Sequence, residues 1–564
     1  MLNLVKELPY QIKKQNKKIN LSDIKEGINS FDEFIVTVFN KDITVYDRNC
    51  DHKGGKIITK DGNHICPIHN WKFDPIKGLY KNGFKKEKRK FTIKGENIII
   101  DVSEKIPCIT KTNVKTKTKI RFFNHAFLKV SGENFSFATD PWAVGPAFNT
   151  GWWLKNQTKK DWIEELNNCS FIYISHNHPD HLHPLTLRNL KKDMNFIVPN
   201  FLTDSTGKYL EELGFKNIFR LKFAHEYEMP NSNLILSILK SGDFREDSGI
   251  YFSNGELTCL FDVDSNSINF NRFPEVDLYA SSFAGGASGY PIMFDNYNKI
   301  EKSKILNRNK LFLKRKKQNI FNETKTKYFM PYAGFFIERL DRDKSVNLLQ
   351  DKNKISDYLS ICKKNNINLL DVEKKDEYIF DGVNLTSSSN KKVKYFNDLN
   401  PEVYLKNYKK NFNKIDINFI KNYFENSSFT DNLILFISLV DDNFKRSKID
   451  FKIDFSGEKP VFSKINNFSG KLNKLKDKKQ LYLKCRTESF LNTIYNKEPW
   501  EDLSIGFQCK VKREPNEYNY KFWYHFSNTY ITSKNVRYTT DCNNCDKLNH
   551  LIDRELAFKN SLNI

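Results

Sequence analysis

Short hydrophobic runs separated by polar turns dominate the first hundred residues. Residues 34–39 and 43–46 are rich in β-branched and aromatic side chains, as is typical of strands. Four turn signals follow at short spacing: Gly54-Gly55, Asp61-Gly62, Lys77-Gly78 and Asn82-Gly83. The pattern predicts a small all-β domain over residues 1–105.

The pattern changes between residues 118 and 340, where strand-like runs alternate with longer segments. The runs are 135–138, 171–174, 234–239, 257–261 and 278–280. Residues 161–167 and 185–190 have helical character, and the alternation predicts an α/β domain with layered sheets. Residues 341–564 are polar, aromatic and Lys-rich, and we expect a C-terminal accessory region of mixed α and β structure.

The composition is that of a multidomain globular protein. The chain has 564 residues, of which 39% are hydrophobic, enough for a large core. The apolar run 433–440 is far shorter than the ~20 residues of a membrane helix, and the N-terminus has no apolar signal region. We therefore expect a cytoplasmic protein without a membrane span.

The chain is basic, with 91 Lys and Arg against 68 Asp and Glu, a net charge of +23. A basic surplus can indicate nucleic-acid binding. Here the lysines are scattered over the whole length, and no basic helix or RNA-binding aromatic motif accompanies them. We expect no nucleic-acid partner, but a surface that attracts small anions such as nucleotide sugars.

Two Cys/His pairs form the first candidate metal site. Cys50 and His52 are followed, after thirteen residues, by Cys66 and His69. Two thiolates and two imidazoles could bind tetrahedral zinc, but zinc fingers pair Cys with Cys and His with His. One Cys and one His in each half suits a [2Fe–2S] cluster with both thiolates on one iron and both imidazoles on the other.

The strings C-D-H-K-G-G and C-P-I-H-N-W resemble those of Rieske proteins. The resemblance implies that Cys50, His52, Cys66 and His69 hold the cluster at two hairpin tips. Ile68 stands where respiratory-chain Rieske proteins have a disulfide-forming Cys, so the resemblance is to the soluble, oxygenase-feeding type.

A second candidate metal site follows the apolar run 171–174, which predicts a buried strand. The run leads directly into four potential ligands: His176, His178, Asp180 and His181. Ligands at the end of a buried strand are held rigidly and face a crevice. Their mixed nitrogen and oxygen donors suit zinc, iron or manganese.

The H-x-H-x-D-H string resembles the metallo-β-lactamase fold and implies an αββα sandwich over residues 118–340. Asp140 matches an early structural Asp, and Asp264 a bridging carboxylate, with Asp262 the weaker choice. No His lies in residues 241–248, where a third-strand ligand is expected, and His225 is an unconvincing substitute. No late His follows Asp264 in this domain. We therefore expect one transition metal, with iron favoured, rather than a hydrolytic dizinc pair.

Four longer strings resemble the CMP-N-acetylneuraminate hydroxylase family. They span residues 140–154, 282–291, 331–335 and 499–508, in the family's order. The resemblance implies a monooxygenase that hydroxylates the N-acetyl methyl group of CMP-N-acetylneuraminate to the N-glycolyl form. It also implies O2 and an electron-donor protein, either cytochrome b5-like or a ferredoxin with its reductase.

The residues agree with such chemistry, because a methyl C–H bond is inert to acid–base groups and a Rieske cluster delivers single electrons. Catalytic roles would fall on His176, His178, Asp180, His181 and Asp264. One alternative is an oxygenase acting on a different N-acyl nucleotide sugar. A second is a metal-dependent hydrolase whose Rieske domain only senses redox state. A third is a non-enzymatic electron carrier with an inactive second domain, which metal analysis of that domain would distinguish.

Overall fold

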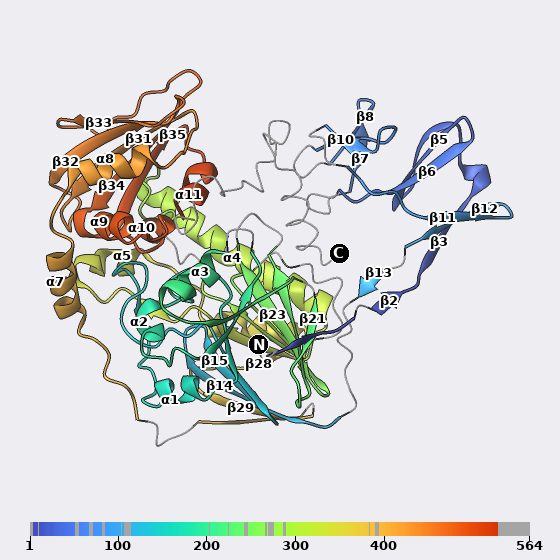
Figure 1. The fold of residues 1–564 in the computed structure, drawn as a ribbon, viewed down its shortest axis with the longest axis horizontal. Coiled ribbons are helices and arrows are strands. Elements are labelled where there is room, and N and C mark those ends of the chain that lie inside the picture. The colour runs from blue at the N-terminus through green and yellow to red at the C-terminus, as the bar shows by residue number, and fades with distance from the viewer. Residues whose placement is uncertain are drawn as a thin grey trace.

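A computed structural model describes most of the chain. The described residues are 4–9, 11–50, 56–66, 71–81, 85–102, 104–106, 114–201, 204–223, 225–241, 246–265, 268, 276–285, 289–382, 384–389 and 394–527. They form a small β unit, a two-sheet sandwich and a C-terminal α/β unit (Figure 1). This order of units agrees with the predicted fold class.

The N-terminal unit consists of small antiparallel sheets. Its strands are β2 (Gln11–Lys13), β3 (Asn16–Asn20), β4 (Gly27–Ser30), β5 (Phe34–Phe39), β6 (Asp42–Asp47), β7 (Ile58–Lys60), β8 (Asn63–Ile65), β9 (Lys72–Asp74), β10 (Leu79–Tyr80), β11 (Phe91–Lys94), β12 (Asn97–Asp101) and β13 (Glu104–Ile106). The main sheets have the orders β4-β5-β6, β11-β12-β3 and β10-β9-β8-β7. Alternating burial along β12 places Ile98 and Ile100 in the core, as a half-buried strand requires.

The sandwich contains two eight-stranded sheets. The first has the order β1 (Lys6–Glu7), β21 (Glu226–Glu228), β22 (Leu234–Lys240), β23 (Ser248–Asn254), β24 (Leu257–Val263), β25 (Leu278–Ser282), β26 (Tyr328–Tyr332) and β28 (Asn368–Leu369). The second has the order β20 (Asn217–Leu221), β19 (Asn195–Pro199), β18 (Phe171–Tyr173), β16 (Phe135–Thr139), β15 (Phe127–Gly132), β14 (Lys117–Asn124), β29 (Glu377–Asp381) and β30 (Asn384–Ser388).

Both sheets contribute to one large apolar core, and helices cover their outer faces. Phe137 of β16 meets Phe252 of β23 edge to face at 5.2 Å between ring centroids. Helices α1 (Trp162–Asn167), α2 (Pro184–Leu187) and α3 (Ser205–Glu212) cover the second sheet. On the first sheet, Tyr279 contacts Phe321 of α4 (Lys299–Thr324). The layers are those of an αββα sandwich, as the sequence predicted.

Segments from outside residues 118–340 complete the sandwich. Strand β1, near the N-terminus, pairs with β21 at one edge of the first sheet. Strands β28, β29 and β30 follow residue 340 and extend both sheets. The sandwich is therefore built from a longer and less continuous part of the chain than the apolar pattern indicated.

The C-terminal unit has a five-stranded sheet with helices packed on it. The strand order is β33 (Val461–Ile465), β32 (Ser447–Asp454), β31 (Leu433–Val440), β34 (Lys479–Arg486) and β35 (Cys509–Glu514). The chain between the sandwich and this unit contains β27 (Phe336–Ile337), η3 (Asp341–Asp343), α5 (Lys344–Leu349), η4 (Ile355–Tyr358), α6 (Leu359–Lys364) and α7 (Pro401–Asn411). Strand β27 pairs with β17 (Trp153–Leu154), which lies between β16 and α1. The unit's helices are α8 (Ile417–Glu425), α9 (Thr487–Tyr495), α10 (Glu501–Ile505) and α11 (Tyr520–Ser527).

No helix among the described residues has both the length and the apolar character needed to cross a membrane. The longest, α4, is 26 residues long and carries many lysines. The apolar run 433–440 forms the central strand β31.

Candidate metal centres

Two of the predicted cluster ligands lie in the core of the N-terminal unit. Cys50 and Cys66 are each 1% exposed and belong to one apolar cluster with the aromatic rings of Tyr46, Trp71, Phe73 and Tyr80. Cys66 donates its backbone N–H to the carbonyl of Trp71, which closes the second loop. His52 and His69 lie outside the described residues.

The H-x-H-x-D-H string lies at the end of β18, as predicted. The imidazoles of His176 and His178 face each other, with Nε2 of His176 2.9 Å from Nδ1 of His178. Asp180 places Oδ2 3.3 Å from Nε2 of His181. All four side chains lie in one cluster, and His181 is completely buried.

Asp264 belongs to the same cluster and Asp262 does not. The Oδ2 atom of Asp264 is 3.8 Å from Nε2 of His181, and the side chain is 36% exposed. Asp262 is buried and accepts a hydrogen bond from the hydroxyl of Tyr279. An ion pair joins Asp262 to the buried ammonium of Lys317 at 3.7 Å.

Two further residues were not found from the sequence. His125, in the turn between β14 and β15, places Nε2 3.1 Å from Oδ2 of Asp180. Asp247 is 3% exposed, precedes β23, and acts electrostatically on His178. Asp247 lies in the stretch where a third-strand His was sought, so a carboxylate stands there instead. His225 is not a substitute, because its Nδ1 atom lies 2.6 Å from Glu7 at the edge of the first sheet.

We call the following residues the His/Asp centre: His125, His176, His178, Asp180, His181, Asp247 and Asp264. Five of these residues form two overlapping triads of donor atoms, one of His125, Asp180 and His181 and the other of His176, His181 and Asp264. His178 and Asp247 are in neither triad. Within each triad the donor atoms lie within 4.8 Å of one another. Imidazole and carboxylate donors in this arrangement suit a transition metal.

The buried charges of the centre also favour a cation. Burial alone would raise the pKa of Asp180, but His181 and His125 lower it well below its usual range. Burial would lower the pKa of His178, and Glu501 raises it. The Oδ1 atom of Asp180 and the Nδ1 atom of His125 are buried without a hydrogen-bond partner among the described residues. Unmatched polar atoms are costly in a protein interior, and a metal ion would satisfy such groups.

Asp140 contacts Ser175 and His181 and orients the imidazole of His181. Its Oδ1 atom accepts the backbone N–H of Ser175 at 2.7 Å, and its Oδ2 atom accepts the Ser175 hydroxyl at 2.8 Å. The same Oδ2 atom lies 3.1 Å from Nδ1 of His181, which leaves Nε2 facing the centre. Carboxylates in this position fix the tautomer of a metal-binding histidine. The structural role expected for Asp140 agrees with these contacts.

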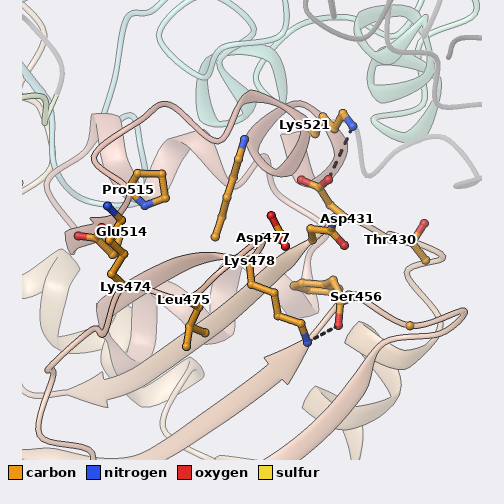
Figure 2. Close-up of a pocket in the computed structure, with 14 residues that line it drawn as sticks. Thr430, Asp431, Ser456, Lys474, Leu475, Asp477, Lys478, Glu514, Pro515 and Lys521 are labelled. Carbon is orange, nitrogen blue, oxygen red and sulfur yellow. Dashed lines mark hydrogen bonds and ion pairs between the residues drawn. The ribbon is translucent and has the colours of Figure 1, made fainter. Parts of the chain in front are cut away.

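A separate cleft of about 760 Å³ lies in the C-terminal unit (Figure 2). It is lined by Thr430, Asp431, Asn432, Phe455, Ser456, Gly457, Lys474, Leu475, Asp477, Lys478, Lys479, Glu514, Pro515 and Lys521. None of these residues belongs to the His/Asp centre. This cleft is therefore separate from the His/Asp centre.

Residues 8–93 match the Rieske [2Fe-2S] domain family. Three relatives with the same description, cytidine monophosphate-N-acetylneuraminic acid hydroxylase, match most of the chain. The protein of Asterias rubens is 27% identical over 84% of this chain and 77% of its own length. The protein of Xenopus laevis is 27% identical over 90% of this chain and 91% of its own length. The protein of Mus musculus is 26% identical over 90% of this chain and 94% of its own length.

Two solved structures are similar to about half of the chain. The diiron β-hydroxylase CmlA of Streptomyces venezuelae is 16% identical, covers 50% of this chain and 55% of its own, and has a TM-score of 0.32. The metallo-β-lactamase fold protein YhfI of Bacillus subtilis is 12% identical and has a TM-score of 0.28. The match covers 47% of this chain and 99% of that protein.

The Rieske match and the sheet layers define the architecture: an N-terminal Rieske domain followed by an αββα sandwich. Over most of its length the chain is similar to the cytidine monophosphate-N-acetylneuraminic acid hydroxylases, and the resemblance predicted from the sequence is confirmed.

Proposed function

We propose that this protein is a monooxygenase that hydroxylates the N-acetyl methyl group of CMP-N-acetylneuraminate. The observation that carries the proposal is the buried His/Asp centre in a chain that also contains a Rieske domain. An oxygenase needs both a metal to activate O2 and a supply of single electrons. The names of the relatives supply the substrate.

Cys50, His52, Cys66 and His69 would hold the [2Fe–2S] cluster. The two cysteines lie in one apolar core, which suits thiolates that share an iron. Electrons would come from a separate donor protein, either cytochrome b5-like or a ferredoxin with its reductase. The donor is inferred from the family resemblance, and the cytoplasmic location from the sequence pattern.

Residues of the His/Asp centre would hold one transition metal, with iron favoured. The proposed ligands are His176, His178, Asp180, His181 and Asp264, and the structure adds His125 and Asp247 as neighbours. When bound, iron supplies the O2 chemistry that an inert methyl C–H bond requires.

The protein's own side chains orient and shield this centre. Asp140 holds Nε2 of His181 toward the centre, and the Ser175 hydroxyl lies 2.8 Å from Nδ1 of His176. The ring of Phe148 packs against His178 with 5.8 Å between centroids and limits the access of water to it. Fixed ligands in a shielded site favour oxidation of a bound substrate over side reactions.

Incubation with isotopically labelled O2 tests the proposal. We expect mass spectrometry to show a product one oxygen atom heavier than CMP-N-acetylneuraminate, with the label from O2 on the N-acyl methyl group. Free N-acetylneuraminate should react far more slowly, because the nucleotide contributes binding energy that positions the methyl group.

The same experiment separates the alternatives. Equal rates with and without the CMP group would indicate an oxygenase for another N-acyl substrate. Incorporation of label from water, without a need for O2 or reductant, would indicate a metal-dependent hydrolase.

A further inference from the structure

One carboxylate of the C-terminal unit reaches the His/Asp centre. Glu501, the first residue of α10, places Oε2 3.4 Å from Nε2 of His178. Its Oε1 atom accepts the hydroxyl of Tyr518 at 3.4 Å, and its backbone N–H donates to Oγ of Ser527. The side chain of Glu501 is 25% exposed. Contacts on both sides therefore hold this carboxylate against the imidazole of His178.

Close backbone packing fixes α10 against the sandwich. A Cβ atom at Gly151 would lie 2.0 Å from the carbonyl oxygen of Gly506, and one at Gly289 would lie 2.0 Å from that of Ser504. Only glycine permits such approaches. Trp152 also donates Nε1–H to the carbonyl of Ile505 at 3.2 Å. The helix that carries Glu501 thus has little freedom relative to the centre.

A buried network of charges joins the same two units. Arg342, in η3, is 5% exposed and contacts the carboxylates of Asp442 and Glu488. Its second amino group donates to Oγ1 of Thr150 at 2.7 Å and to Oε1 of Gln508 at 3.0 Å. Buried charges are tolerated only when they are paired, so separating the two units would leave these charges without their partners.

We infer that Glu501 is a positioning residue for the metal centre and that the C-terminal unit is required to supply it. A carboxylate beside Nε2 of His178 keeps the proton on that nitrogen. The lone pair of Nδ1 then faces Nε2 of His176, where a shared metal ion would bind. This role rests on the proposed metal centre and gives the region after residue 433 a function in it.

Metal retention tests the inference on the full-length protein. Wild type, Glu501→Gln and Glu501→Ala are loaded with iron under anaerobic conditions and exposed to a chelator. Metal per chain is followed over time, and the Rieske cluster is quantified separately by its absorption. The control is Glu517→Ala, an exposed residue of the same unit.

We expect Glu501→Ala to lose the second metal about 10–100-fold faster than wild type. Glu501→Gln should fall between them, because its amide oxygen accepts the hydrogen bond without the charge, and Glu517→Ala should match wild type. Equal retention in wild type and Glu501→Ala would overturn the inference. A role in packing alone would leave the isosteric Glu501→Gln unchanged, and that result would overturn it too. A wild type that binds metal only in its Rieske cluster would instead overturn the proposed centre itself.

Discussion

The four proposed Rieske ligands lie between residues 50 and 69, whereas the His/Asp centre draws on residues from 125 to 264. The Rieske pairs occupy two short stretches of the chain, 50–52 and 66–69. The His/Asp centre needs the β14–β15 turn, the end of β18 and the end of β24, and Glu501 adds contact from α10. The Rieske cluster should therefore depend mainly on the residues around its own ligands. The His/Asp centre, which is built from distant segments, should depend on the packing of the whole sandwich.

Reciprocal substitutions test this difference and have the largest expected effect. Cys66→Ala removes a thiolate of the cluster, so the Rieske electron paramagnetic resonance signal and product formation should both be abolished. His181→Ala removes the residue shared by both donor triads, so product formation should be lost while the Rieske signal remains.

Metal analysis of both variants completes the test. Cys66→Ala should retain metal in the second centre, and His181→Ala should lose it. Loss of both metals in either variant would contradict the independence of the two sites.

The sequence predicted those ligands that are close together in the chain. The H-x-H-x-D-H string lies on one strand end, so its spacing was sufficient to identify it. His125 precedes this string by fifty-one residues and enters the centre only because β14, β15, β16 and β18 are neighbours in one sheet. A lone His in a turn gives no signal from spacing. The same limit applies to β29 and β30, whose short strands join the second sheet from beyond residue 340.

Some signals were present but needed the fold for their interpretation. The strings at residues 140–154 and 499–508 marked the family, and the structure shows that they meet at the Gly151–Gly506 contact. Asp247 was in the stretch searched for a third-strand His, and a carboxylate there acts on His178. A residue takes part in the centre only if its side chain is buried there and points toward the other ligands. Neither property follows from the order of residues alone.

A pair of histidine substitutions tests which distant residues belong to the His/Asp centre. The expected loss is smaller than the complete loss predicted above. His125→Gln removes an imidazole 3.1 Å from Asp180 and should lower metal affinity or turnover about 10–100-fold. His225→Gln is the matched control, because His225 pairs with Glu7 at the sheet edge and should leave both unchanged. Equilibrium metal titration and initial rates measure the two effects. Equal values for both variants would exclude His125 from the centre.

The smallest expected effect concerns the buried network of charges around Arg342, which joins the sandwich to the C-terminal unit. The Rieske site lies in another unit and does not depend on this network. Burial alone would raise the pKa of Asp442, but the hydrogen bond from Lys409 and the charge of Arg342 lower it to about 2. An unfolded Asp has a pKa of about 3.9, so the unfolded chain binds the proton more tightly. The carboxylate therefore contributes stability that is complete above about pH 4 and is lost as the pH falls toward 2. The shift corresponds to about 2.6 kcal/mol, and solvent screening at this partly exposed carboxylate reduces the expected contribution to about 2 kcal/mol.

Asp442→Asn should remove this contribution. We expect it to lower the free energy of unfolding by about 2 kcal/mol at pH 6 and by progressively less below pH 4, as urea unfolding followed by tryptophan fluorescence would show. Asp381→Asn, at an exposed position of β29, is the control and should follow the wild type at each pH. The Rieske absorption of Asp442→Asn should match that of the wild type at each pH. A pH-independent loss in Asp442→Asn would mean that packing around this side chain, and not its charge, holds the units together.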